Sequence, residues 1–398
     1  MSLPICRFPE APASPRRPAA LDDDLLEEIL LRIACPADLA RASAACATFR
    51  RLVTDATFLR RYRSLHPPLL LGFIETVSSG FQPAEAPHPN AAAARSIACP
   101  ADGFSFDYLP PTRWNWNLWD ACDVRDGRVL LKSSPMCMMG YGGVNFPELV
   151  VCDPLFRRYQ LLPPIPDDLL ASVHVQQQNF PSFEAFLVPS GEEEDGTSFR
   201  VIGRAHRAIK SVVFVFSSGS GLWSVGTTWD DLNLGGSILL CRCYAYGYIY
   251  WKVMRANKLL KLDINKMDFS IIDLPPHYDE RDVIIVEAGK GRVGVFSHIK
   301  FATSVYHAIQ EKEGKIADGC QSEMITHLPA SYDFCMVGGA AEGYICFVGF
   351  PKDRRVDAAS FSLQVNTLKI EMVCRMMFQS FYIHPYFGYP PSMSPRRI

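Results

Sequence analysis

The sequence predicts a multidomain chain with a small all-α domain followed by an all-β domain. We interpret the second as a β-propeller, with a β-sandwich as the alternative. Three observations support this: apolar residues at helical spacing up to residue 66, short β-type runs from residue 104 on, and patterns that recur within those runs. The 398 residues then divide into a disordered Pro/Ala tail (1–20), a helical domain (21–66), a linker (67–103) and a β-domain (104–398).

The helical domain is predicted as three or four short helices. The aspartates at 22–24 can cap the first helix and suit the positive end of its dipole. Pro36 lacks an N–H, so one helix should end near Ala34 and the next should start near Pro36. Asp55 offers a cap for the last helix. A segment this short cannot bury all of its apolar residues by itself. This indicates that the helices bind a partner protein. The alternative is that they pack against the rest of their own chain.

The residue order in this segment resembles the F-box. The matching features are Leu21, Asp23-Asp24, Leu25-Leu26-Glu27-Glu28-Ile29-Leu30, Cys35-Pro36, Asp38-Leu39, Cys46, Phe49, Arg50 to Val53, and Asp55 with Phe58-Leu59. Three positions depart from the family pattern: Asp22 replaces a usual Pro, Phe49 replaces a common Trp, and Ala34-Cys35 replaces a frequent Pro.

The resemblance implies that the helices dock on a Skp-type adaptor and through it on a cullin. It implies that the interface is made by apolar side chains. The expected contacts are Leu21, Leu25, Ile29, Leu30, Ile33, Pro36, Leu39, Cys46 and Phe49.

The β-domain contains two recurring patterns. Residues 149–164 and 259–276 each have an apolar strand that ends in Asp, a turn, and a second strand that ends in Leu-Pro-Pro. Asp at such a turn can accept hydrogen bonds from the backbone that follows. A glycine before an apolar strand also recurs, at Gly127, Gly247, Gly291 and Gly343. Repeats of about 40 to 50 residues are typical of propellers and predict about six blades. The gap between residues 127 and 247 is too long for one blade, so at least one repeat there lacks the glycine pattern.

These repeats resemble the β-rich, kelch-like regions that follow the F-box in plant F-box proteins. The resemblance implies the substrate-recognition subunit of an SCF-type (Skp–cullin–F-box) ubiquitin ligase, whose β-domain binds an unknown target protein and carries no catalytic residues. Two alternatives remain: a propeller enzyme or small-molecule sensor with an accessory helical segment, and an F-box protein that acts outside a ubiquitin ligase.

Composition restricts the partners and the compartment. The net charge of −2 and the lack of a basic stripe argue against nucleic acid. No long apolar run predicts a membrane helix, and the N-terminus has no secretory h-region. The 13 cysteines are scattered through apolar runs and predict buried, reduced thiols, with no metal and no cofactor. We therefore expect a protein of the cytoplasm, the nucleus or both.

Four motifs are candidate sites of chemistry. Gly289, Gly291 and Gly294 spell a G-x-G-x-x-G motif, but a strand follows, so a glycine-rich hairpin is favoured over a dinucleotide site. The acidic run 192–195 favours a solvated loop over a carboxylate pair. Trp114 and Trp116 would share one strand face, either as blade packing or as a surface for a partner. Cys241 and Cys243 would also share one face, where buried thiols are favoured over a metal.

Overall fold

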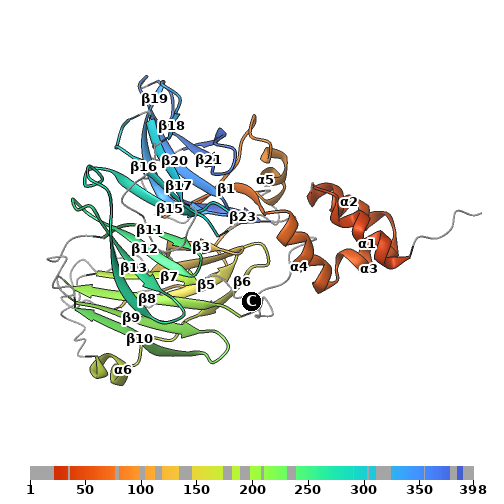
Figure 1. Cartoon of the computed structure of the whole chain (residues 1–398). Coiled ribbons are helices and arrows are strands. Elements are labelled where there is room, and N and C mark those ends of the chain that lie inside the picture. The colour runs from red at the N-terminus through yellow and green to blue at the C-terminus, as the bar shows by residue number, and fades with distance from the viewer. Residues whose placement is uncertain are drawn as a thin grey trace, which may run out of the picture. The chain divides into compact units, whose positions relative to one another are not determined.

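A computed structural model describes residues 22–34, 36–76, 80–98, 104–112, 119–133, 146–173, 182–188, 198–207, 210–230, 239–289, 291–302, 304–310, 324–353, 355–376 and 383–388. The chain divides into two compact units, Met1–His66 and Pro67–Ile398. Each unit is described by itself, and Figure 1 shows the elements of both.

The described residues of the first unit form four helices: α1 (Asp23–Leu31), α2 (Pro36–Ala45), α3 (Ala47–Val53) and α4 (Ala56–Leu65). Pro36 is the first residue of α2, as predicted. Helix α1 packs on α3 and α4, and α2 packs on α3. Asp55 caps α4 by accepting hydrogen bonds from the N–H groups of Thr57 and Phe58. The core side chains of the helices are Leu30, Leu31, Leu39, Leu52, Val53, Phe58 and Tyr62.

The second unit is a β-propeller of six sheets, five of them four-stranded and one three-stranded. Blade 1 is β3 (Trp119–Arg125), β4 (Arg128–Ser133), β5 (Leu149–Asp153) and β6 (Arg158–Leu161). Blade 2 is β7 (Ser182–Val188), β8 (Arg200–Arg207), β9 (Lys210–Ser217) and β10 (Leu222–Asp230). Blade 3 is β11 (Leu239–Ala245), β12 (Tyr248–Val253), β13 (Lys258–Asp263) and β14 (Asp268–Asp273).

Blade 4 is β15 (Asp282–Glu287), β16 (Val293–His298), β17 (Ser304–Gln310) and β18 (Met324–His327). Blade 5 is β19 (Tyr332–Ala341), β20 (Tyr344–Pro351), β21 (Ala359–Gln364) and β22 (Ile370–Arg375). The short helix α6 (Asp167–Ser172) lies between blades 1 and 2 in the chain. The first strand of each of these blades is an inner strand: β3 contacts β7, β11 contacts β15, and β15 contacts β19.

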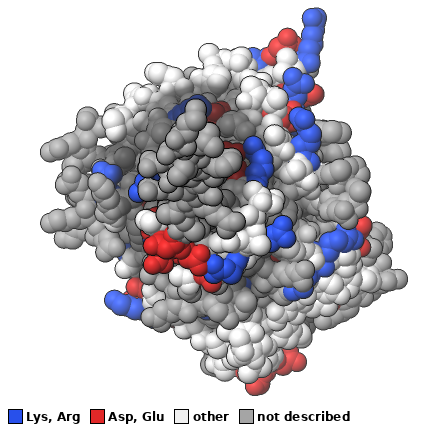
Figure 2. Space-filling model, turned by 90° about the vertical axis from the view of Figure 1, so that its right-hand side faces the viewer, with Lys and Arg blue, Asp and Glu red and all other residues white. Residues whose placement is uncertain are grey.

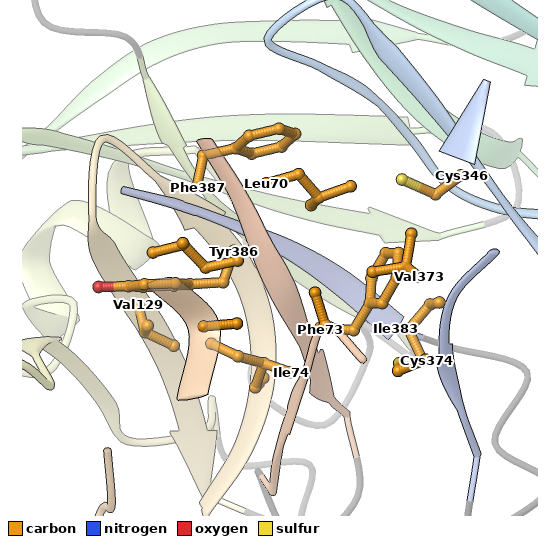
Figure 3. Packing of buried hydrophobic residues seen from close by; sticks show 14 of the residues in the cluster. Leu70, Phe73, Ile74, Val129, Cys346, Val373, Cys374, Ile383, Tyr386 and Phe387 are labelled. Atoms are coloured by element: carbon orange, nitrogen blue, oxygen red, sulfur yellow. The ribbon is translucent and has the colours of Figure 1, made fainter. Parts of the chain in front are cut away.

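The closing blade joins the two ends of the propeller. Its strands are β23 (Ile383–Gly388), β1 (Leu69–Glu75) and β2 (Phe81–Pro83), and β1 pairs antiparallel with both others. β23 completes the inner ring because it contacts β3 and β19. The cluster of buried side chains that holds this closure is drawn in Figure 3, where the labelled residues are Leu70, Phe73, Ile74, Val129, Cys346, Val373, Cys374, Ile383, Tyr386 and Phe387.

The expectation of a linker at residues 67–103 needs correction. In its described part, this range holds β1, β2 and the helix α5 (Ala91–Ile97), which packs on both strands. Six of the seven residues of β1, from Leu70 to Glu75, are buried. The strand was missed because its partner β23 lies at the other end of the sequence, so no local repeat marks it.

The recurring patterns of the sequence are turns of the blades. Asp126-Gly127, Tyr246-Gly247 and Glu342-Gly343 each join the first two strands of a blade, with positive φ at both residues. Two such residues make the type I′ turn that suits a twisted hairpin. The Oδ1 atoms of Asp153 and Asp263 each accept hydrogen bonds from two backbone N–H groups that follow them in the chain. Blade 2 has a longer connection between its first two strands, so the two-residue turn with glycine does not recur there.

Candidate functional site

Two exposed aliphatic side chains on α1 form the first candidate site, which we call the α1 surface. Leu25 is 52% exposed and Ile29 is 49% exposed. They are four residues apart, so both lie on one face of the helix. Among the other predicted adaptor contacts, Cys46 is exposed, and Ile33 and Phe49 are half-buried. These five side chains are accessible to a partner to different degrees.

Three of the other predicted adaptor contacts lie inside the helical unit. Leu30 is 3% exposed, Leu39 is 0% exposed, and Pro36 is buried. The helical spacing of apolar residues shows which residues share a face of a helix. It does not show whether that face points into a small bundle or away from it. These three side chains therefore act in the fold of the unit, and Leu21 lies outside the described residues.

Asp22 and Cys46 have structural roles at helix ends. The side chain of Asp22 accepts a hydrogen bond from the N–H of Leu25 at 2.8 Å and caps α1. The Sγ atom of Cys46 accepts one from the N–H of Phe49 at 3.4 Å and caps α3. Asp22 therefore stabilises the helix that carries the α1 surface.

Ion pairs connect α1 to the basic helices that follow it. Arg51 pairs with Asp23 at 2.6 Å, and Arg61 pairs with Glu27 and Glu28 at 2.5 Å each. These groups are largely exposed, so each pair contributes little free energy of folding. The buried core holds α1 in place, and the ion pairs turn its acidic residues toward α3 and α4.

A cluster of charged side chains on the inner strands β3, β7 and β11 and on the neighbouring β8 forms the second candidate site, which we call the axial cluster. Arg242 on β11 pairs with Asp123 on β3 at 2.8 Å and with Glu184 on β7 at 2.9 Å. Glu184 also pairs with Arg204 on β8 at 3.0 Å and accepts a hydrogen bond from the indole N–H of Trp251 at 3.1 Å. The cluster joins blades 1, 2 and 3.

The charges of the axial cluster stabilise one another. Burial alone would raise the pKa of Glu184, but the charges of Arg204 and Arg242 outweigh it, so the pKa is lowered. Burial disfavours the charged form of Arg242 as well, yet Asp123 and Glu184 raise its pKa. Both partners of the Glu184–Arg242 pair are therefore ionised at neutral pH.

Neighbouring titratable groups stay neutral. Burial lowers the pKa of His384 on β23 to about 4, and its Nε2 lies 3.4 Å from the hydroxyl of Thr76. Burial raises the pKa of Cys122 to about 12, and its thiol donates to the carbonyl of Leu130. A general acid or base works best with a pKa near the operating pH, and a nucleophilic cysteine needs a thiolate. The axial cluster is therefore suited to holding the blades together and to binding a charged group.

The sequence did not indicate the axial cluster. Its members are single charged residues in apolar strands, far apart in the chain, and only the ring of inner strands brings them together. An isolated Arg or Glu within an apolar strand, such as Glu184 in SFEAFLV, is the signal that could have identified them.

The remaining sequence candidates have varied outcomes. The glycine-rich hairpin is confirmed: β15 and β16 pair antiparallel on either side of Gly289 and Gly291, both with positive φ. Cys243 is buried, whereas the side chain of Cys241, the tryptophans 114 and 116, and the acidic run 192–195 lie outside what the structure describes. In the described residues, no three His, Cys, Asp or Glu side chains are grouped to hold a metal, and none of the helices could span a membrane.

Surface charge is mixed on the face shown in Figure 2, where acidic and basic side chains lie close together at several places among uncharged residues.

No family model matches the sequence, and no curated protein matches it. A post-proline cleaving enzyme from Rickettsia typhi is 11% identical with a TM-score of 0.35, and the match covers 70% of this chain and 39% of that enzyme. An oligogalacturonate lyase in complex with manganese is 10% identical with a TM-score of 0.35, over 64% of this chain and 65% of that one.

YCF48 from Cyanidioschyzon merolae is 8% identical with a TM-score of 0.36, over 65% of this chain and 71% of that one. Likenesses this distant carry no information about activity, substrate or partner.

Proposed function

We propose that this chain is the substrate-recognition subunit of an SCF-type ubiquitin ligase. Its helical unit docks on a Skp-type adaptor, which links it to a cullin, and its propeller holds a target protein for ubiquitination. The observation that carries the proposal is the α1 surface. Leu25 and Ile29 stand half-exposed on a capped helix whose other face is buried, which is the arrangement of a helix that packs against a partner.

The energetics support such docking. Full burial of a Leu or Ile side chain contributes about 1.5–3 kcal/mol relative to full exposure. Leu25 and Ile29 have about half of their surface left to bury, so each would contribute about 1 kcal/mol on binding. The half-buried Ile33 and Phe49 would add smaller amounts. The propeller supplies loops for recognition on a rigid scaffold.

Co-purification with a Skp-type adaptor tests the proposal. The full chain should retain the adaptor, and the double variant Leu25→Asp/Ile29→Asp should lose it because two charges would enter a desolvated interface. Leu65→Asp is the matched control: Leu65 on α4 is 60% exposed and is not among the predicted contacts. Equal recovery of adaptor by the wild type and the double variant would overturn the interface. A circular dichroism melt of each variant excludes unfolding as the cause of a loss.

A small-molecule sensor is the second candidate function, since charged groups converge on the inner strands of blades 1 to 3. The sensor would bind its ligand without needing the adaptor. The third, an F-box protein outside a ligase, would bind the adaptor and recruit no cullin, so probing the same co-purification for cullin separates it from the first.

A further inference from the structure

Arg204 and His206 lie on the same face of β8, because side chains two residues apart in a strand point the same way. Arg204 is 3% exposed. Its Nη2 and Nε atoms both donate to the Oε2 of Glu184, at 3.0 and 3.3 Å. Its guanidinium carbon lies 5.0 Å from the centre of the Trp251 ring. These contacts fix the guanidinium by one edge, so the direction of the remaining Nη1 is fixed as well.

Two buried nitrogen atoms at this place have no hydrogen-bond partner among the described residues: Nη1 of Arg204 and Nδ1 of His206. Burial lowers the pKa of His206, the charge of Arg204 lowers it further, and the charge of Glu184 opposes both. A buried donor without an acceptor is costly, and most such groups in folded proteins have a partner. An acceptor that is not part of the described chain would satisfy both atoms.

The strands beside β8 place no carboxylate opposite His206. In the axial cluster, the two carboxylates of Asp123 and Glu184 are balanced by Arg204 and Arg242. The positions opposite His206 are Ser182 on β7 and Ser211 on β9, which are both uncharged. An anionic acceptor at Nη1 of Arg204 and Nδ1 of His206 would therefore meet a cationic donor and no opposing carboxylate directly across from His206.

We propose that Arg204 and His206 form a carboxylate-binding site, in which Nη1 of Arg204 donates to one oxygen and the neutral His206, in the tautomer that carries its proton on Nδ1, donates to the other. Two fixed donors match a planar carboxylate, whereas a phosphate would leave a third oxygen without a donor among the described residues. The carboxylate comes either from a free small acid or from an Asp or Glu side chain of a bound protein. The second source rests on the proposed function, because it makes this site part of target recognition.

Isothermal titration calorimetry on the full chain tests the site with three probes: succinate, a short glutamate-rich peptide, and the same peptide with glutamine in place of glutamate. Arg204→Lys keeps the charge toward Glu184 and removes the second edge of the guanidinium. His206→Phe keeps the ring and removes Nδ1, which makes no bond within the described chain, so folding should be unaffected. Arg355→Gln, an exposed arginine of blade 5, is the control for loss of a surface charge.

The wild type should bind succinate or the glutamate peptide, and not the glutamine peptide. Each of Arg204→Lys and His206→Phe should weaken that binding by roughly tenfold or more, since one charge-assisted hydrogen bond is lost. Arg355→Gln should bind like the wild type.

Binding of succinate assigns the site to a small acid, and binding of the glutamate peptide alone assigns it to a protein side chain. The site is refuted if neither carboxylate binds, or if both variants bind as tightly as the wild type. Adaptor binding does not depend on these residues, so failure here leaves the adaptor interface standing.

Discussion

Substitution of Glu184 by Gln would test whether the axial cluster holds the propeller together. Glu184 faces Arg204 at 3.0 Å and Arg242 at 2.9 Å, and its side chain is 27% exposed. Gln keeps the size of the side chain and leaves Arg204 without an anionic partner. Removing one member of a buried ion pair costs about 3–5 kcal/mol. Because the site is partly solvated and Arg242 keeps Asp123, we expect about 2–3 kcal/mol.

Differential scanning calorimetry at pH 7 measures this loss. For a unit as long as Pro67–Ile398, about 2–3 kcal/mol corresponds to a fall of roughly 3–4 °C in Tm. Glu280→Gln is the control, because Glu280 is an exposed residue of the loop between β14 and β15. Its Tm should stay within about 1 °C of the wild type, as surface substitutions usually change stability by less than about 0.5 kcal/mol.

The same comparison has a pH dependence with a defined sign. The pKa of Glu184 is lowered in the folded chain, so its stabilisation is fully present above the unfolded carboxyl pKa and is lost as pH falls through the folded value. The Tm difference between wild type and Glu184→Gln should therefore be constant at neutral pH and shrink below about pH 4. A Tm equal to that of the wild type at pH 7, or a difference that grows as pH falls, would refute the reasoning.

Three further predictions follow from the fold. Leu30→Asp should unfold the helical unit, seen as loss of helical circular dichroism, because Leu30 is a core residue; a folded variant would contradict its place in the core. Gly343→Ala should lower stability to urea by about 1 kcal/mol or more, because φ is +78° there, and an unchanged midpoint would argue against the turn. A thiol reagent should modify the exposed Cys46 in the native chain, and it should modify Cys346 and Cys374 only on unfolding. Burial raises the pKa of the last two thiols to about 12, so little reactive thiolate is present. Mass spectrometry of the modified peptides checks the order of modification.

Local chemistry made part of this structure predictable. Pro36 as the start of a helix, Asp153 and Asp263 as turn residues, and the glycine turns each depend on residues close in sequence. The propeller followed from the spacing of those turns.

Features that depend on distant residues were not predictable in the same way. β1 becomes a strand of the closing blade only because β23 reaches it from the other end of the chain. Leu30 and Ile29 are neighbours of similar hydrophobicity, yet one is buried and the other is half-exposed, which depends on how α1 packs on α3 and α4. The axial cluster required the positions of three blades.

Titration of the full chain with a purified Skp-type adaptor tests the central proposal most directly. We predict a saturable one-to-one complex whose Kd rises by roughly tenfold or more in Leu25→Asp/Ile29→Asp and is unchanged in Leu65→Asp. No binding by the folded wild-type chain, or equal Kd values for the wild type and the double variant, would contradict it.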